Sequence, residues 1–234
     1  MTDPIPPYEL DEVVVRGQRR RPGGAFPAGP GGGGGAGDGG GEYQNEVGEN
    51  DPPPDQVDPC ADPETRREWD RDAAAASARK KMEAAALAAG EDGLTHRERA
   101  CWLLRQPDGS IIASEPIEGD TFQPGVTPTT FMDPYQVSDM SRIVGIVHNH
   151  GPGFHGPSSP SGAYGGDAAA LATLQNIMNT YPVNNGWQAR LCIVAKTEGA
   201  DSYNKINVYG PENISSGTGP EVNPDADLQA CPAN

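Results

Sequence analysis

The stretch from Pro22 to Val57 most limits what this chain can fold into. Its 36 residues include 13 glycines and 6 prolines, with five consecutive glycines at 31–35. Glycine leaves the backbone conformationally free and proline removes a hydrogen-bond donor, so such a stretch forms no stable helix or strand. We therefore predict a disordered linker at 22–57, which separates an N-terminal peptide at 1–21 from one folded domain.

The rest of the chain has the composition of a single domain. Only 35% of the 234 residues are hydrophobic, so we expect one core at 58–211 and a flexible tail at 212–234, where Gly, Pro, Asn and Asp return. The formal net charge of −16 argues against nucleic-acid or anionic-membrane partners, which repel such a charge. No apolar run approaches the roughly 18 residues of a membrane span.

The N-terminal peptide lacks both the basic start and the apolar centre of a conventional signal peptide. Export by a secretion route that does not require a signal peptide is the alternative that is left open. Within 8–21, three consecutive valines lie between an acidic and a basic patch. This pattern predicts one short strand or a docking peptide, which cannot fold alone.

A long helix is predicted at 63–89. Asp62 is a suitable N-cap, Pro63 suits the first helical position, and Gly90 ends the pattern. Most of its apolar residues are alanines, and the few larger ones form a thin stripe. We expect this helix to pack at the domain edge, with a helical arm or a partner-binding helix as the alternative.

Strand and helix patterns alternate after this helix, which predicts an α/β domain. A Pro-Asp-Gly turn between two β-rich runs indicates a hairpin. Apolar positions three and four residues apart predict an amphipathic helix that begins at Asp167, and the segment 115–140 is expected to be an extended excursion. The expected strands are at 100–106, 110–114, 142–150, 190–196 and 205–210, and the one at 142–150 is expected to be buried and central.

Three of the four histidines, His148, His150 and His155, lie within eight residues at the end of this apolar strand. Side chains alternate along a strand, so His148 and His150 face the same side and can converge on one metal ion. Asp167 can return to the strand end and add a carboxylate oxygen. Two imidazoles and a carboxylate suit Zn²⁺ and leave a fourth position for water.

Plainer interpretations of these residues stay open. His148 and His150 could simply end a strand in a polar loop, and Asp167 could only cap its helix. His155 is expected at the surface or beside the ligands rather than on the metal. A zinc-activated water also needs a base, for which Glu98, just ahead of the hairpin, is the candidate. On local grounds Glu98 could equally be an exposed side chain in a charged loop.

The four cysteines are far apart and include no Cys-x-x-Cys pair, which excludes a zinc ribbon or a thioredoxin-like motif. Reduced thiols are the simplest expectation. In an oxidising compartment Cys60 could pair with Cys231, or Cys101 with Cys192, and the spacing does not choose between connectivities.

The order of these features resembles a known family. A Glu ahead of a β-hairpin, an apolar strand ending in His-x-His, a loop, and an Asp opening a helix resemble the JAB/MPN (JAMM) metalloprotease pattern. Over about 94–211, the segments RERACWLLRQPDGSIIASEPIEGD, IVGIVHNHG and LCIVAKTEGADSYNKINVYGP resemble more narrowly the JAB-like domains of bacterial polymorphic toxins and secreted effectors. The resemblance implies a cytidine-deaminase-like fold, a mixed sheet flanked by helices. It also implies that His148, His150 and Asp167 bind Zn²⁺ and that Glu98 is the catalytic acid/base.

The chain departs from the family pattern in the loop before the Asp. The pattern has a Ser three residues before the Asp, where this chain has Tyr164, and the loop is longer than usual. Ser161, or else Ser158 or Ser159, is the candidate to supply the missing hydroxyl, which stabilises the tetrahedral oxyanion.

The function implied by the resemblance is zinc-dependent hydrolysis of peptide or isopeptide bonds by a secreted effector or toxin. Such a protein is made in the bacterial cytoplasm and delivered to a target cell without a cleavable signal peptide, for example by a type VI system. Its partners would be a protein or peptide substrate and a cognate immunity protein. The alternative is an inactive JAB-like domain that binds a partner protein. An HNH nuclease is disfavoured, because His148, Asn149 and His150 are contiguous and the charge of −16 opposes DNA binding.

Overall fold

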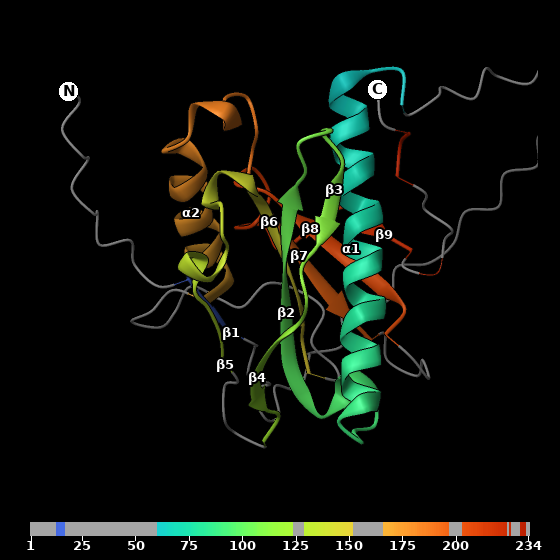
Figure 1. Ribbon diagram of the computed structural model, residues 1–234. Coiled ribbons are helices and arrows are strands. Elements are labelled where there is room, and N and C mark those ends of the chain that lie inside the picture. The colour runs from blue at the N-terminus through green and yellow to red at the C-terminus, as the bar shows by residue number, and fades with distance from the viewer. Residues whose placement is uncertain are drawn as a thin grey trace, which may run out of the picture.

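A curled mixed β-sheet lies between two helices in the computed structural model (Figure 1). The structure describes residues 13–16, 60–123, 129–151, 166–196, 203–223, 225 and 230–232. Helix α1 spans Pro63–Ala88 and helix α2 spans Gly166–Asn179, and they cover opposite sides of the sheet (Figure 1). The predicted α/β class is confirmed. The predicted linker at 22–57 lies outside the described residues.

The main sheet has seven strands, of which one neighbouring pair is parallel. Strands β6 and β7 run parallel, and every other pairing in this sheet is antiparallel. A parallel pair needs a crossover connection, and α2 lies in that crossover. The strand order is β3 (Ile111–Ala113), β2 (Arg97–Arg105), β6 (Ile143–Asn149), β7 (Arg190–Ala195), β8 (Lys205–Tyr209) and β9 (Glu221–Val222), and β4 (Ile117–Thr121) also pairs with β2.

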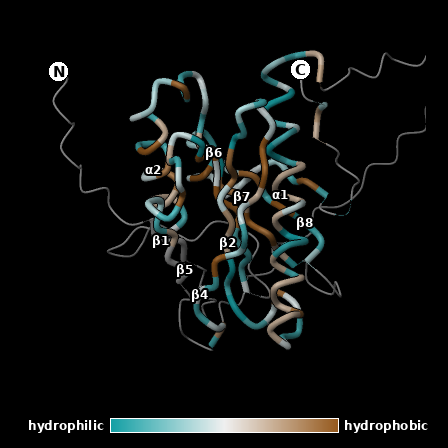
Figure 2. The backbone as a smooth tube through the Cα atoms, in the orientation of Figure 1, coloured by the Kyte–Doolittle hydropathy of each residue, from teal (hydrophilic) through white to brown (hydrophobic). Residues whose placement is uncertain are grey.

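Strand β6 is the centre of the fold, as its apolar sequence predicts. All seven of its residues are buried, because helices cover both faces of the sheet. Figure 2 shows apolar residues concentrated on the strands between the helices. Gly145 is required here, since a Cβ would lie 2.9 Å from the Leu103 side chain and 3.0 Å from the Arg190 carbonyl oxygen.

Helix α1 begins as its cap residues predict. The Asp62 carboxylate accepts hydrogen bonds from the backbone N–H groups of Glu64 and Thr65, at 3.1 and 2.8 Å, and Pro63 is the first helical residue. The helix is an outer layer, but its alanine face is buried in the core against β2, β3 and β6. Small side chains let it lie close to the sheet, while Leu87 stays 77% exposed. Among the described residues, neither α1 nor α2 is long and apolar enough to cross a membrane.

The segment 115–140 contains more regular structure than its composition predicts. It includes β4 and a further strand, β5 (Thr129–Met132). Strand β5 pairs antiparallel with β1 (Val13–Arg16), the short strand predicted within the N-terminal peptide. The pairing partner of β1 was not predictable, because it lies more than a hundred residues away. Short 3₁₀ helices lie at Gly93–Thr95, Pro134–Gln136, Met140–Arg142 and Pro182–Asn184.

The described part of the segment after Pro211 is held against the domain, although its composition led us to expect a flexible tail. Strand β9 pairs with β8, and Cys231 forms a disulfide with Cys60, just ahead of α1, with a Cα–Cα distance of 5.6 Å. The Cys231 N–H donates to the buried Asp70 carboxylate at 2.7 Å. These contacts fasten the chain end along α1.

The other two cysteines are free and buried. Cys101 and Cys192 both pair with Val147, one from each neighbouring strand. They are therefore two strand spacings apart, about 9–10 Å, which exceeds the roughly 7 Å Cα separation that a disulfide allows. The Cys101–Cys192 pairing is excluded. Burial raises the pKa of both thiols to about 12, which keeps them protonated and unreactive.

Candidate metal centre

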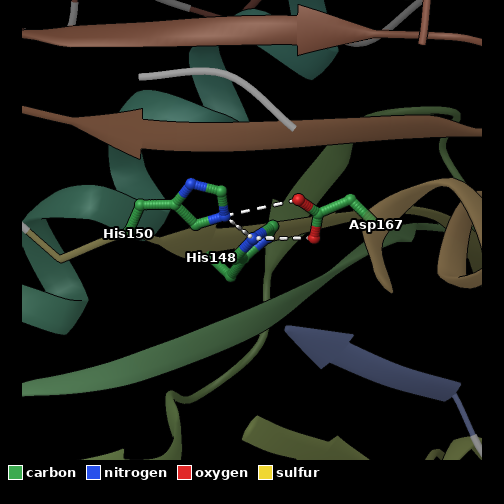
Figure 3. Close-up of side chains that lie close together, drawn as sticks. All are labelled: His148, His150 and Asp167. Atoms are coloured by element: carbon green, nitrogen blue, oxygen red, sulfur yellow. Dashed lines mark hydrogen bonds and ion pairs between the residues drawn. The ribbon is translucent and has the colours of Figure 1, made fainter. Parts of the chain in front are cut away.

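The structure brings together the three residues predicted to bind metal. His148 lies near the end of β6, His150 directly follows that strand, and Asp167 is the second residue of α2. All three side chains are fully buried, and their ligand atoms lie within 4.8 Å of one another. Figure 3 shows the two imidazoles and the carboxylate pointing toward a common point.

The distances fit a tetrahedral ligand set. The Nε2 atoms of His148 and His150 are 2.9 Å apart, and they lie 3.3 and 3.4 Å from the Asp167 carboxylate oxygens. Ligand atoms about 2.0–2.1 Å from one tetrahedral ion are separated by roughly 3.3 Å. This buried group could therefore bind a metal ion through three protein ligands.

The electrostatics of the group also suit metal binding. Burial lowers the pKa of His148 below its usual range, more strongly than the nearby carboxylate raises it. Burial by itself raises the pKa of Asp167, but the charge and hydrogen bonding of the His148 and His150 rings outweigh it and hold the pKa well below its usual range. A neutral imidazole and an ionised carboxylate are the forms that bind metal. No described residue accepts a hydrogen bond from Nδ1 of either histidine.

Asn149 fixes the backbone between the two histidines. Its side chain points to the opposite face of the sheet, where Oδ1 accepts from the Arg99 N–H at 2.7 Å and Nδ2 donates to the carbonyls of Leu94 and Arg97 at 3.0 Å. These bonds join the end of β6 to β2 and to the 3₁₀ turn after α1. The orientation of both imidazoles is thus tied to one buried amide.

A tyrosine supports the same strand end. The Tyr203 hydroxyl lies 2.8 Å from the Leu94 carbonyl oxygen and 2.9 Å from that of His150. The His150 N–H donates to the Val194 carbonyl at 3.1 Å. Both the backbone N–H and the carbonyl of His150 are therefore hydrogen-bonded, although His150 lies beyond the last residue of β6. Strand alternation predicts that Asn149 points to the face opposite the histidines, as it does, but its hydrogen-bond partners were not predicted, and nothing local points to Tyr203.

Glu98 is not the exposed loop residue that its charged neighbours suggested. It is the second residue of β2, which begins three residues earlier than predicted, and its side chain is 0% exposed. In the β2–β6 register Ala100 pairs with His148, and residues two apart on a strand share a face. This alternation is interrupted at Glu98, because β2 has a register shift between Arg97 and Arg99 in its pairing with β4, so Glu98 is placed as the buried residue two positions before the strand partner of His148.

The remaining candidate residues lie outside the part of the chain that the structure describes. These are Ser161, predicted to supply a hydroxyl, its alternatives Ser158 and Ser159, and also His155 and Tyr164. Their predicted roles stay predictions.

Comparison of the chain with protein-family models, with curated proteins and with solved structures finds no match.

Replacing Asn149 with Asp is expected to loosen the histidine pair. The isosteric carboxylate still accepts from the Arg99 N–H but no longer donates to the Leu94 and Arg97 carbonyls. We expect the free energy of unfolding to fall by about 2–4 kcal/mol in urea titrations. We also expect metal affinity, measured by competition with a chromophoric chelator, to fall by roughly 10–100-fold. Asn185→Asp, at an exposed position, is the matched control; equal losses in both variants would contradict the role of Asn149.

Proposed function

We propose that this protein is a metal-dependent hydrolase of peptide or isopeptide bonds with a JAB/MPN-like fold. The observation that carries the proposal is the buried convergence of His148, His150 and Asp167, with the buried Glu98 two residues from the strand partner of His148. A buried carboxylate beside a two-histidine, one-carboxylate ligand set is the arrangement that metal-assisted hydrolysis needs. The order of these residues along the chain agrees with the JAMM resemblance.

Zinc is the metal that we propose for the site. Two imidazole nitrogens and one carboxylate oxygen suit its preference for mixed nitrogen and oxygen ligands in tetrahedral geometry. Three protein ligands leave one position for water or substrate, which distinguishes a catalytic zinc site from a structural one.

Glu98 is the proposed acid/base. A divalent metal held by His148, His150 and Asp167 would lower the pKa of a bound water molecule and polarise a carbonyl group. Glu98 accepts the proton of the attacking water and later donates it to the departing amine nitrogen. His148, His150 and Asp167 take no part in this proton transfer, because each serves as a ligand. We propose that Ser161 supplies the hydroxyl that Tyr164 cannot provide from the usual position.

We further propose that the protein acts as a secreted bacterial effector or toxin on a protein or peptide substrate, with an immunity protein as its partner. The Cys60–Cys231 disulfide supports this setting, because disulfides persist in oxidising compartments and are rare in the cytosol. Synthesis in the cytoplasm and delivery without a cleavable signal peptide, as in a type VI system, would expose the chain to such a compartment.

Metal content is the first test of the proposal. Elemental mass spectrometry of the purified full chain is expected to show about one zinc per chain. His148→Ala, His150→Ala and Asp167→Ala should each remove it, because three ligands are the fewest in a catalytic zinc site. His96→Ala is the control, since His96 is the one histidine outside the cluster at 148–155 and its side chain is 52% exposed. A wild-type chain that takes up no metal even when zinc is supplied would contradict the proposal and favour the alternative, a JAB-like domain that only binds a partner.

A further inference from the structure

Three arginines surround the ring of Trp187 at the end of the sheet remote from the metal ligands. Trp187 lies in the loop that leads into β7, and the guanidinium carbons lie 5.4, 5.5 and 5.4 Å from its ring centroid. All are within the roughly 6 Å range of a cation–π contact. We call this group, made of Arg67, Arg71, Arg105 and Trp187, the arginine cluster.

The arginine cluster is unusual in how its charges are compensated. Arg67 and Arg105 form no salt bridge with any described residue, although the chain has 33 acidic and 17 basic side chains. Arg105 donates only to the Val183 carbonyl, at 3.0 Å. Salt bridges hold most of the other described arginines, which are Arg66, Arg71, Arg79, Arg97, Arg99 and Arg190. Two cations that form no salt bridge with a described carboxylate therefore lie on one ring in a strongly acidic protein.

Arg71 is buried in the middle of the cluster. Its side chain donates to the Gln188 carbonyl at 2.7 Å and pairs with the Glu68 carboxylate. Its residue is only 4% exposed, and its Nε–H has no hydrogen-bond partner among the described residues. A buried donor without a partner is costly, and here it lies beside two cations that form no salt bridge with any described residue.

A small cavity opens at the cluster. It has a volume of about 100 Å³, and Arg67, Arg71 and Trp187 line it. This is the space of about three water molecules, which is enough for one carboxylate or phosphate group but not for a nucleotide. Glu64 and Glu68 line the same cavity, so a singly charged anion is repelled less than a doubly charged one.

We propose that the arginine cluster is a binding site for a carboxylate group. Guanidinium groups bind carboxylates through paired, charge-assisted hydrogen bonds, and the Trp187 ring holds them in place by stacking. The carboxylate belongs either to a free organic acid or to a protein, as an Asp or Glu side chain or a chain terminus. The site is distinct from the metal centre, because Arg105 lies five residues along β2 from Ala100, the partner of His148, or roughly 16 Å away.

The test is a titration of the full chain followed by NMR. Sodium acetate replaces sodium chloride at constant ionic strength, and the Trp187 indole N–H and the arginine Nε–H resonances are recorded. We expect saturable shifts with a dissociation constant on the order of 10 mM. Arg67→Gln should weaken binding about tenfold, whereas Arg66→Gln, which removes the same charge from the adjacent, salt-bridged position, should not. An unchanged resonance of the buried Trp102 indole will show that each variant keeps its fold.

Two further ligands complete the test. N-acetylglutamate α-amide carries one side-chain carboxylate flanked by two amides, as a glutamate in a protein does. Tighter binding of this compound than of acetate assigns the site to a protein partner, whereas equal binding assigns it to a free acid. Inorganic phosphate should bind more weakly than acetate. Non-saturable shifts, shifts that Arg67→Gln leaves unchanged, or tighter binding of phosphate would overturn the proposal. None of these outcomes depends on metal content.

Discussion

A Glu98→Gln variant is expected to lose hydrolytic activity and to keep its metal. Glutamine has nearly the same size as glutamate but cannot accept and return a proton. Glu98 is buried two residues from the strand partner of His148 and is not one of the three converging ligands. General acid–base catalysis contributes about 10²–10⁴-fold, so turnover should fall by at least that range. Turnover should be measured on whichever isopeptide-linked or peptide substrate the wild type cleaves in a screen.

The control for this experiment is Glu115→Gln. Glu115 follows β3. Its side chain is 87% exposed and forms a salt bridge with Lys81, and it is not one of the buried ligands. The Glu115→Gln substitution removes the same charge and leaves the candidate site unchanged. Turnover at the wild-type level in Glu98→Gln would refute the acid/base assignment, and loss of metal from this variant would show instead that Glu98 acts as a ligand.

Removal of the Cys60–Cys231 disulfide is expected to have the largest effect on stability. The two cysteines are 171 residues apart, so the bridge closes a loop that spans nearly the whole described domain. Constraint of the unfolded chain by a loop of this length stabilises the folded state by about 3–5 kcal/mol. The Cys60→Ser/Cys231→Ser double variant should therefore melt about 10 °C lower in a calorimetric scan.

Reductant supplies the matching control for this prediction. Dithiothreitol should lower the melting temperature of the wild type to that of the double variant and leave the double variant unchanged, because Cys101 and Cys192 are already reduced and buried. A reduced wild type that melts at the oxidised temperature would contradict the prediction. The double variant should also lose the contact between the Cys231 N–H and Asp70, which places the chain end against α1.

Local patterns predicted the elements of this fold well. The cap residues Asp62 and Pro63 predicted the start of α1, and the apolar run at 142–150 predicted the central strand β6. Such signals need only residues a few positions apart, because helix capping and strand alternation are local properties. The strands within 115–140 were not predicted, since β4 contains Gly and Asp, which disfavour strands, and β5 has only four residues.

In the candidate site, too, one part could be predicted from the local sequence and another part depends on tertiary contacts. The spacing of His148 and His150 by itself determined that both imidazoles share one face of a strand, because alternation has a period of two. Their meeting with Asp167 depends on how α2 packs after a loop, and the burial of Glu98 depends on the pairing of β2 with β6. Those contacts join residues that are far apart in the chain.

The sequence by itself thus determined the α/β class, the ends of its helices and the pair of histidines. The tertiary structure alone decided that Cys60 and not Cys101 forms the disulfide, that Asn149 and Tyr203 hold the histidine pair, and that arginines from α1 and β2 meet on one tryptophan. The physical reason is that each of these contacts is made only when strand order and helix packing bring distant segments together, which no local pattern encodes.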